Sequence, residues 1–178
     1  MILHIASDGS YLSESKPRSC VGGILYLSSK LPQHNQAPDY NHPFNAPFHV
    51  VAKILKMITI SAMETEVAAT FYNAKEVLPF RVTLAEMGHP QPPTPMDVDN
   101  ETSTGFLKST IKQKRSKTID IRFYWVRDRV NQNQFLIYWR PGANNVGDYV
   151  SKHHSPAHHQ TMRPKCFVNL VFQNPSTV

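Results

Sequence analysis

Four acidic residues are placed so that their carboxylates could share a cation. Asp8 and Asp99 stand where strands are expected to end, and Glu66 lies near the start of an expected helix. The fourth, Asp148, lies in a polar segment near the end of the chain. Clustered carboxylates repel one another, and Mg²⁺ favours oxygen ligands of this kind. Two ions about 3.5–4 Å apart would hold the attacking water and the leaving oxygen of a phosphodiester in line, which is nuclease chemistry.

Each of these acids also has a purely structural interpretation. Either Asp99 or Asn100 is suited to cap a helix, and Asp148 to complement the dipole of a first helical turn. Asp8 precedes a glycine and is suited to a turn. Taken singly, the structural interpretation is the commoner one for each residue.

Two glutamates compete for the second position in this set. Glu64 and Glu66 are two residues apart, which places them about 200° apart around a helix, so both cannot face the same metal. Small residues surround Glu66 at helical spacing, namely Ala62, Ala69 and Thr70. They allow a close approach to a sheet and favour Glu66.

The elements that must position these residues follow a mixed α/β order. Strands are predicted from β-branched and aromatic runs at 2–8, 20–29, 50–61, 95–99 and 135–139. Helices are predicted from about 62 to 78, and at 100–109, 115–130 and 144–152. The first helix has an apolar stripe of Val67, Phe71, Ala74 and Leu78 and is expected to end at Pro79. The alternative for 52–57 is the beginning of a helix.

Composition limits the classes of protein to consider. The chain has 178 residues, 40% of them apolar, which suits one soluble domain. Its two cysteines, Cys20 and Cys166, are 146 positions apart, which excludes a disulfide framework and a four-cysteine zinc site. The beginning of the chain lacks a basic leader, and no apolar run approaches the ~20 residues of a membrane span. We therefore expect an intracellular protein of the cytoplasm or nucleus, without membrane contact and monomeric.

The positive charge is concentrated in one segment. Residues 108–129 contain eight basic and two acidic residues, and the net charge of the whole chain is +6. Aromatic residues are interleaved with the cations, an arrangement that suits a track for nucleic-acid phosphates. The alternative is a solubilising face of a helix. The predicted nucleic-acid contacts are Lys112, Lys114, Arg115 and Lys117.

Five ordered motifs carry a resemblance to a known family. They are Ser-Asp-Gly-Ser at 7–10, Ser-Ala-Met-Glu-Thr-Glu at 61–66, Val-Asp-Asn at 98–100, Lys-Thr-Ile-Asp-Ile-Arg-Phe-Tyr-Trp-Val-Arg at 117–127, and Asn-Val-Gly-Asp-Tyr-Val-Ser-Lys at 145–152. In this order they resemble the ribonuclease H domain of copia-type retrotransposon polyproteins. The resemblance covers roughly residues 1–155, which we take as the domain, and leaves 156–178 as a loosely ordered C-terminal tail.

The resemblance implies both a fold and an activity. It implies a ribonuclease H-like α/β fold, with a mixed five-stranded sheet flanked by helices. The implied activity is cleavage of the RNA strand of RNA–DNA hybrids with two Mg²⁺ or Mn²⁺ ions. Asp8, Glu66, Asp99 and Asp148 match the four metal-binding acids of the family.

Two departures from the family pattern bear on activity. Cellular relatives have a histidine in the loop before the last acid, and Pro141–Gly147 contains none. Gly147 also replaces the usual alanine, at a cost of about 1 kcal/mol if that position is helical. These departures favour reduced activity. The alternative function is a catalytically decayed ribonuclease H-like domain, derived from a retrotransposon, that only binds nucleic acid.

Overall fold

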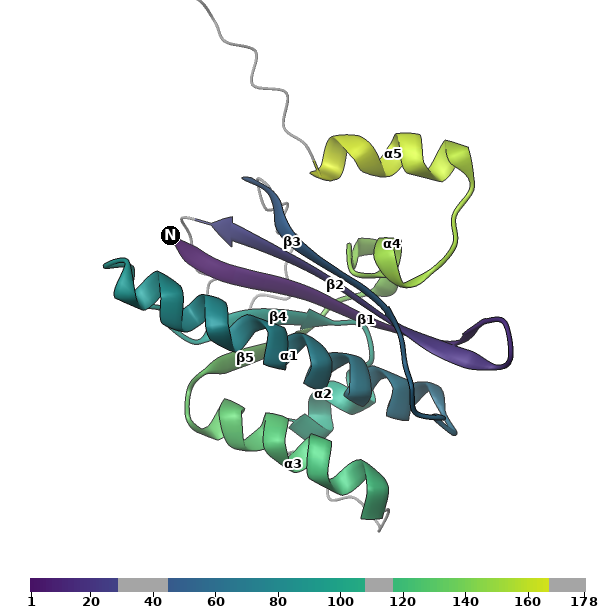
Figure 1. Cartoon of the computed structure of the whole chain (residues 1–178), viewed down its shortest axis with the longest axis horizontal. Helices are drawn as coiled ribbons and strands as arrows, with labels where there is room; N and C mark the ends of the chain where they lie inside the picture. Colours follow the sequence, from purple (N-terminus) through teal and green to yellow (C-terminus); the bar gives the residue numbers. More distant parts are fainter. Residues whose placement is uncertain (29–44, 108–116, 167–178) are drawn as a thin grey trace, which may run out of the picture.

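The chain alternates strands and helices much as its apolar patterns predict. A computed structural model describes residues 1–28, 45–107 and 117–166 (Figure 1). The strands are β1 (Ile2–Glu14), β2 (Arg18–Ser28), β3 (Asn45–Ile54), β4 (Thr94–Val98) and β5 (Phe135–Trp139). The helices are α1 (Ala62–Glu86), α2 (Glu101–Leu107), α3 (Lys117–Asn131), the 3-10 turn η1 (Gly142–Asn144), α4 (Asp148–Ser151) and α5 (Pro156–Cys166).

The five strands form one mixed sheet in the order β3-β2-β1-β4-β5. β1 pairs antiparallel with β2, and β2 pairs antiparallel with β3. β4 runs parallel to β1 on one side and to β5 on the other. This confirms the mixed five-stranded sheet with flanking helices that the resemblance implied.

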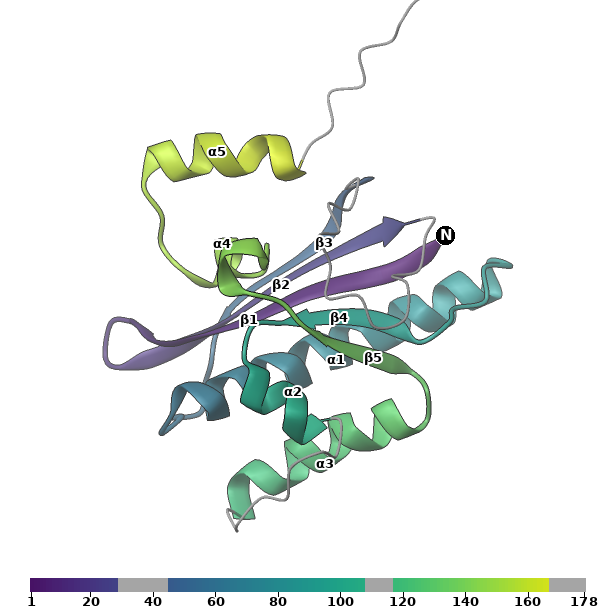
Figure 2. The same cartoon turned by 180° about the vertical axis from the view of Figure 1, so that it is seen from behind.

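Two adjacent glycines of β2 show that helices cover both faces of the sheet. A Cβ atom built on Gly23 would lie 2.2 Å from the side-chain oxygen of Asn73 in α1. A Cβ atom on Gly22 would lie 2.5 Å from the backbone oxygen of Gly147, at the start of α4. Successive residues of a strand point to opposite faces. Therefore α1 packs on one face and α4 on the other, as the two opposite views show (Figures 1 and 2).

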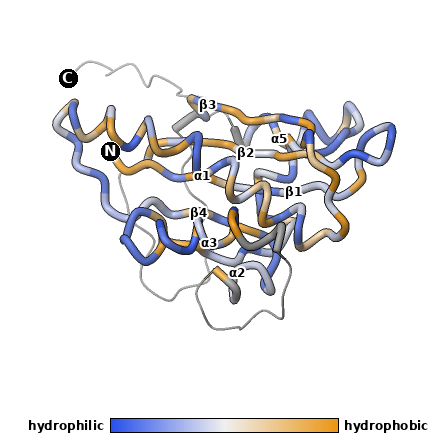
Figure 3. Tube along the Cα trace, turned by 60° about the horizontal axis from the view of Figure 1, so that its bottom comes forward, coloured by the Kyte–Doolittle hydropathy of each residue, from blue (hydrophilic) through white to orange (hydrophobic). Residues whose placement is uncertain are grey.

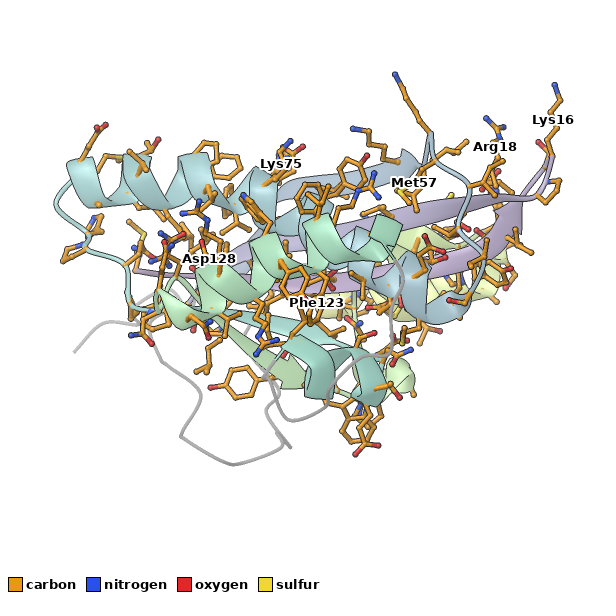
Figure 4. The ribbon with its side chains drawn as sticks, turned by 90° about the horizontal axis from the view of Figure 1, so that it is seen from below. Lys16, Arg18, Met57, Lys75, Phe123 and Asp128 are labelled. Atoms are coloured by element: carbon orange, nitrogen blue, oxygen red, sulfur yellow. The ribbon has the colours of Figure 1, made fainter. Side chains whose placement is uncertain are left out.

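The apolar core lies between the sheet and α1, α2 and α3. The strands contribute residues such as Leu3, Ile5 and Ile137, all almost fully buried. Hydrophobic residues accordingly concentrate along the strands (Figure 3). From α3, Phe123 (Figure 4) and Val126 belong to this core. The predicted apolar stripe of α1 is confirmed, because its members are either buried in the core or packed against it: Val67, Phe71, Ala74 and Leu78.

The expectation that Pro79 ends the first helix is wrong, because α1 continues to Glu86. Proline removes one backbone N–H and one helical hydrogen bond. Burial of Val77 and Leu84 on either side of the proline offsets this loss. The Arg81 guanidinium also donates to the backbone oxygens of Pro92 (2.7 Å) and Gln91 (3.2 Å), which ties the helix to the segment before β4.

The predicted strand at 50–61 is displaced, because β3 spans Asn45–Ile54. The last register pair joins Cys20 to Ile54, and one more backbone bond follows, from the N–H of Leu55 to the backbone oxygen of Ser19. The chain then leaves the sheet and Ser61 caps α1. The predicted start of this helix near Ala62 is confirmed.

The predicted helix over 144–152 is wrong in its first half. Only Asp148–Ser151 is α-helical, and a 3-10 turn occupies Gly142–Asn144. Asn145 prevents a continuous helix because its buried side chain donates to the backbone oxygen of Ser7 (2.7 Å) and accepts the N–H of Gly147 (3.0 Å). Asn145 is therefore held extended against β1.

A helix that the sequence pattern did not predict follows α4. Pro156 begins α5, where a proline is well tolerated because the first helical N–H groups have no partner within the helix. The division of the chain at residue 155 stays a prediction. Among the described residues, no helix has the length and hydrophobicity that crossing a bilayer requires.

Candidate functional site

Three of the four predicted acids converge at one end of the parallel strand pair. Asp8, Glu66 and Asp99 each offer a carboxylate oxygen, and these oxygens all lie within 4.8 Å of one another. The last register pair between β1 and β4 is Ala6 with Asp97. Asp8 and Asp99 each lie two residues beyond that pair, where the parallel strands part. The fold therefore brings together acids that are far apart in the sequence.

Glu66 reaches this cluster from α1 and is held by β1. Its Oε2 atom accepts the backbone N–H of Gly9 at 2.8 Å. The residue is only 2% exposed, and its Oε1 atom has no hydrogen-bond partner among the described residues. A buried carboxylate oxygen without a partner is costly, so it is a suitable ligand atom for a cation.

The competing glutamate has a different role. Glu64 Oε2 accepts the backbone N–H of Ile60 (2.8 Å), while the hydroxyl of Ser61 accepts the N–H of Glu64 (3.1 Å). The two bonds cap α1 in a variant of the capping box, in which the glutamate accepts the N–H of the residue before the cap residue, Ser61. The geometry thus brings Glu66, and not Glu64, to the acidic cluster.

Asp8 is held by α4, which covers the face of the sheet opposite α1. The hydroxyl of Ser151 in α4 donates to Asp8 Oδ2, and Asp8 is only 1% exposed. Asn145 fixes the segment before α4 to the backbone of Ser7, next to Asp8. The short helix α4 is therefore part of the structure that orients the first acid.

Asp99 is not the cap of the following helix. The side-chain oxygen of Asn100 accepts the N–H of Ser103 (2.9 Å) and caps α2 instead. The other acid of β4, Asp97, is buried in an ion pair with Arg140, whose Nε lies 2.9 Å from Asp97 Oδ2. Of Asp97 and Asp99, it is therefore Asp99 that is free to face Asp8 and Glu66.

Asp148 lies close to the cluster without joining it. It is the first residue of α4, and its carboxylate forms an ion pair with Lys152, four residues later. Its negative charge raises the pKa of both Asp8 and Asp99, so it lies within electrostatic range of them. The structure therefore brings together three of the four predicted ligands and places the fourth beside them.

Burial and mutual repulsion make these carboxyl groups hard to ionise. Burial raises the pKa of Asp8 to about 6, with further contributions from the charges of Asp99 and Asp148. Burial, followed by the charges of Asp99 and Asp8, raises the pKa of Glu66 well above its ordinary value. Burial also raises the pKa of Asp99. Such crowded acids are stabilised in their charged form by a cation.

The ligand chemistry of the cluster suits a hard divalent cation. All three residues offer carboxylate oxygens, and Glu66 has one oxygen, Oε1, that lacks a partner among the described residues. Mg²⁺ and Mn²⁺ favour such oxygen donors, commonly with several waters retained. Asp8, Glu66 and Asp99 would hold one such ion.

Residues that position the acids were present in the motifs but received no role from the sequence pattern. Ser151 and Lys152 follow Asp148 by three and four residues, the spacing at which helical side chains meet. That spacing was the available signal for the ion pair of Lys152. The contact from Ser151 to Asp8 had no such signal, because it joins residues 143 positions apart.

Both departures from the family pattern can be located in the structure. Gly147 directly precedes α4 and has helical backbone angles (φ −60°, ψ −32°), so the cost expected for glycine at a helical position applies. A Cβ atom there would lie 3.0–3.1 Å from the backbone of Ser7 and Ala6, so glycine allows a close approach to β1. The segment before Asp148 has no histidine; His154 follows α4, with its Nε2 atom 3.3 Å from the backbone oxygen of Asp148.

The predicted basic contacts fall largely outside the described part of the chain. Lys112, Lys114 and Arg115 lie outside the described residues, and Lys117 is the first residue of α3. Of the interleaved aromatics, Trp125 packs edge-on against Phe71 at 5.2 Å, so its ring is engaged within the fold. The nucleic-acid contacts of this segment stay a prediction.

Comparison with known proteins supports the fold and the sequence resemblance. No family model matches the chain. A Retrovirus-related Pol polyprotein from transposon TNT 1-94 of Nicotiana tabacum is 25% identical over 101 residues. That match covers 57% of this chain and 8% of the polyprotein. The chain thus corresponds to a small part of the relative's length.

Similar solved structures are ribonuclease H domains. LC11-RNase H1, isolated from compost, has a TM-score of 0.57 and 13% identity, with 83% of this chain and 91% of that chain covered. The same enzyme in complex with an RNA/DNA hybrid gives 0.52 and 11%, covering 83% and 92%. The N-terminal RNase H domain of a Mycobacterium tuberculosis protein gives 0.54 and 14%, covering 84% and 90%. The chain therefore has a ribonuclease H-like fold, and its sequence is similar to part of a retrotransposon polyprotein.

Proposed function

We propose that this chain is a metal-dependent endoribonuclease that cleaves the RNA strand of RNA–DNA hybrids. The observation that carries the proposal is the convergence of Asp8 in β1, Glu66 in α1 and Asp99 just after β4, with one carboxylate oxygen of each within 4.8 Å of the others, in a ribonuclease H-like fold. A helix cap or a turn explains an isolated acid but gives no reason for three of them to meet. Bringing buried carboxylates together is unfavourable unless a cation compensates their charge.

The chain's own residues have distinct tasks in this proposal. Asp8, Glu66 and Asp99 bind the first divalent ion, and Asp148 completes the site of a second ion together with Asp8. Ser151 orients Asp8, and the N–H of Gly9 orients Glu66. When bound, the ions supply an activated water and stabilise the leaving oxygen of the phosphodiester.

The proposed substrate follows from the relatives. One structural neighbour was solved with an RNA/DNA hybrid, and the sequence relative is a retrotransposon polyprotein. We propose the same class of nucleic acid for this chain. The other activities of a polyprotein are not transferred to it, since the match covers 8% of that protein.

The test is cleavage of a hybrid whose RNA strand carries a 5′ label, with Mg²⁺ or Mn²⁺. Expected is cleavage of the RNA strand in the hybrid, with the DNA strand and an RNA–RNA duplex of the same sequence intact. Asp99→Asn serves as the matched inactive protein and excludes a contaminating nuclease. Hybrid binding without cleavage by folded, metal-loaded protein would contradict the proposal and favour the binding-only alternative.

The basic segment is proposed to contact the phosphate backbone. Each phosphate contact contributes roughly 0.9 to the slope of log affinity against log salt on the duplex scale. Replacing the four residues by glutamine should therefore weaken hybrid binding at low salt and flatten its salt dependence. An unchanged slope of log affinity against log salt would contradict this proposal and favour a solubilising surface. The residues replaced are Lys112, Lys114, Arg115 and Lys117.

A further inference from the structure

The fourth predicted acid, Asp148, differs from the other three because it is engaged in an ion pair. The Asp148 carboxylate contacts the Lys152 ammonium one helical turn later. Both side chains are partly accessible, 26% for Asp148 and 42% for Lys152. An exposed pair of this spacing ordinarily contributes little and concerns only its two members.

Lys152 acts on more than its partner. Its positive charge opposes the rise in pKa of each of the three clustered acids, Asp8, Glu66 and Asp99. Two features of α4 fix this position: Gly147 packs against the backbone of β1, and the hydroxyl of the adjacent Ser151 donates to Asp8. The ammonium is thus attached to the same short helix that orients the first acid, and it lies within electrostatic range of all four carboxylates.

We propose that Lys152 is a built-in counter-ion that occupies the carboxylate of the second metal site and makes the second divalent ion bind much more weakly than the first. This inference rests on the proposed function, because it assumes that the four acids bind metal. The first site, formed by Asp8, Glu66 and Asp99, does not need Asp148. A second ion that uses Asp148 must instead displace an ammonium ion from that carboxylate, against direct charge repulsion.

Lys152 is a positioning residue in this account and touches no reacting atom. It keeps the acidic site compensated when no second ion is present. Occupancy of the second site then depends on a competing attraction, such as the phosphate of a bound strand that draws the ammonium away. The two metal sites would therefore fill in sequence rather than together.

The experiment counts Mn²⁺ ions bound per chain without nucleic acid, by titration calorimetry and by electron paramagnetic resonance of free Mn²⁺. For the wild type we expect one ion to bind tightly and the second at least tenfold more weakly. Lys152→Gln should tighten the second ion about tenfold and change the first much less. Lys152→Arg, which keeps the charge, should retain the weak second ion.

Lys75→Gln is the matched control. Lys75 is an exposed residue of α1, nine positions after Glu66, and its ammonium lies over the ring of Phe71 (Figure 4). This variant should bind Mn²⁺ as the wild type does. Thermal unfolding in the presence of a chelator gives a second readout: Lys152→Gln should melt below the wild type, and Mn²⁺ should raise its melting temperature more.

The outcomes separate this inference from the proposed function. Tight first-ion binding with an unchanged second ion in Lys152→Gln would overturn the role of Lys152 and leave the nuclease proposal standing. Equal affinity for both ions in the wild type would do the same. If neither protein binds Mn²⁺, both the inference and the metal-dependent function are wrong.

Discussion

The two faces of the sheet differ in chemistry and in what they contribute. The face covered by α1, α2 and α3 is apolar, with buried residues such as Leu3, Ile5 and Phe135. The face toward α4 also buries apolar residues, namely Ala6, Ile24 and Tyr26, but around Asp8 it is polar. There Asp8 accepts from Ser151, and Asn145 bonds to the backbone of β1. The first face provides the larger apolar core, and the polar end of the second face orients Asp8.

This difference explains where the site lies. Glu66 comes from α1 on the apolar side, whereas Asp8 is held from the polar side by α4. They meet with Asp99 beyond the last paired residues of β1 and β4, where these two strands no longer pair and side chains from both faces can approach one another. The stabilisation from the apolar core therefore offsets the electrostatic repulsion among the crowded carboxylates.

We expect the largest effect from substitutions of the acids themselves, measured as loss of hybrid cleavage. Asp99→Asn should reduce hybrid cleavage on the order of 10³-fold, because residues that bind one metal act as a unit. Asp148→Asn should cost only about tenfold, since water can replace a peripheral ligand. Single-turnover cleavage measures both, and urea unfolding should show no loss of stability in either variant. Equal losses of cleavage would show that the ranking of the two acids is wrong.

Breaking the apolar side should affect stability instead. Phe135 is 1% exposed in the core, and Phe135→Ala should lower the free energy of unfolding by about 3–5 kcal/mol. Urea unfolding measures the loss. Tyr124→Ala on α3 is a suitable control, because that side chain is 58% exposed and should change stability by less than about 0.5 kcal/mol. A similar loss in both variants would contradict the assignment of the core.

The pH dependence of stability should report the crowded acids. The pKa of Asp8 is about 6 in the fold against 3.8 ordinarily, so the folded chain binds its proton more tightly than the unfolded chain. Stability from this group is fully present below pH 4 and is lost as the pH rises through 6. The loss by pH 7 is on the order of 3 kcal/mol, mainly through burial.

Urea unfolding in a chelator at pH 4.5, 5.5 and 7 tests this linkage. Asp8→Asn should flatten the profile, and excess Mg²⁺ should restore stability at pH 7. The raised pKa values of Glu66 and Asp99 act in the same direction. A metal-free protein that becomes steadily more stable from pH 4.5 to 7 would show that the acids are not crowded as described.

The smallest effects should come from two adjacent glycines that face opposite sides. Gly22→Ala places a methyl group against the backbone of Gly147, so α4 must move and Ser151 should lose its contact with Asp8. Gly23→Ala places it against the side chain of Asn73. Each should cost about 1–3 kcal/mol of stability. Cleavage per folded molecule should fall more in Gly22→Ala, and equal cleavage would contradict the role of α4.

The residues of the candidate site were easier to predict from the sequence than the boundaries of several helices and strands. The motif at 98–100 predicted both an acid of the cluster and a helix cap, but only the structure showed that Asn100, and not Asp99, provides the cap. The extent of α1 beyond Pro79 was not predictable from local pattern, because burial of Leu84 outweighs the cost of the proline. The helix over 144–152 failed for a similar reason: the partner of Asn145 is the backbone of Ser7, at the other end of the chain.

Local properties of the sequence determined the elements with strong periodicity and the identity of the acids. The β-branched run of β5, the apolar stripe of α1 and the five ordered motifs depend on neighbouring residues, and the sequence presents these directly. Only the tertiary structure decided which acids meet and which are already paired. Glu66 joins Asp8 and Asp99, while Asp148 is engaged by Lys152, because distance and charge between residues far apart in the sequence depend on how the elements pack.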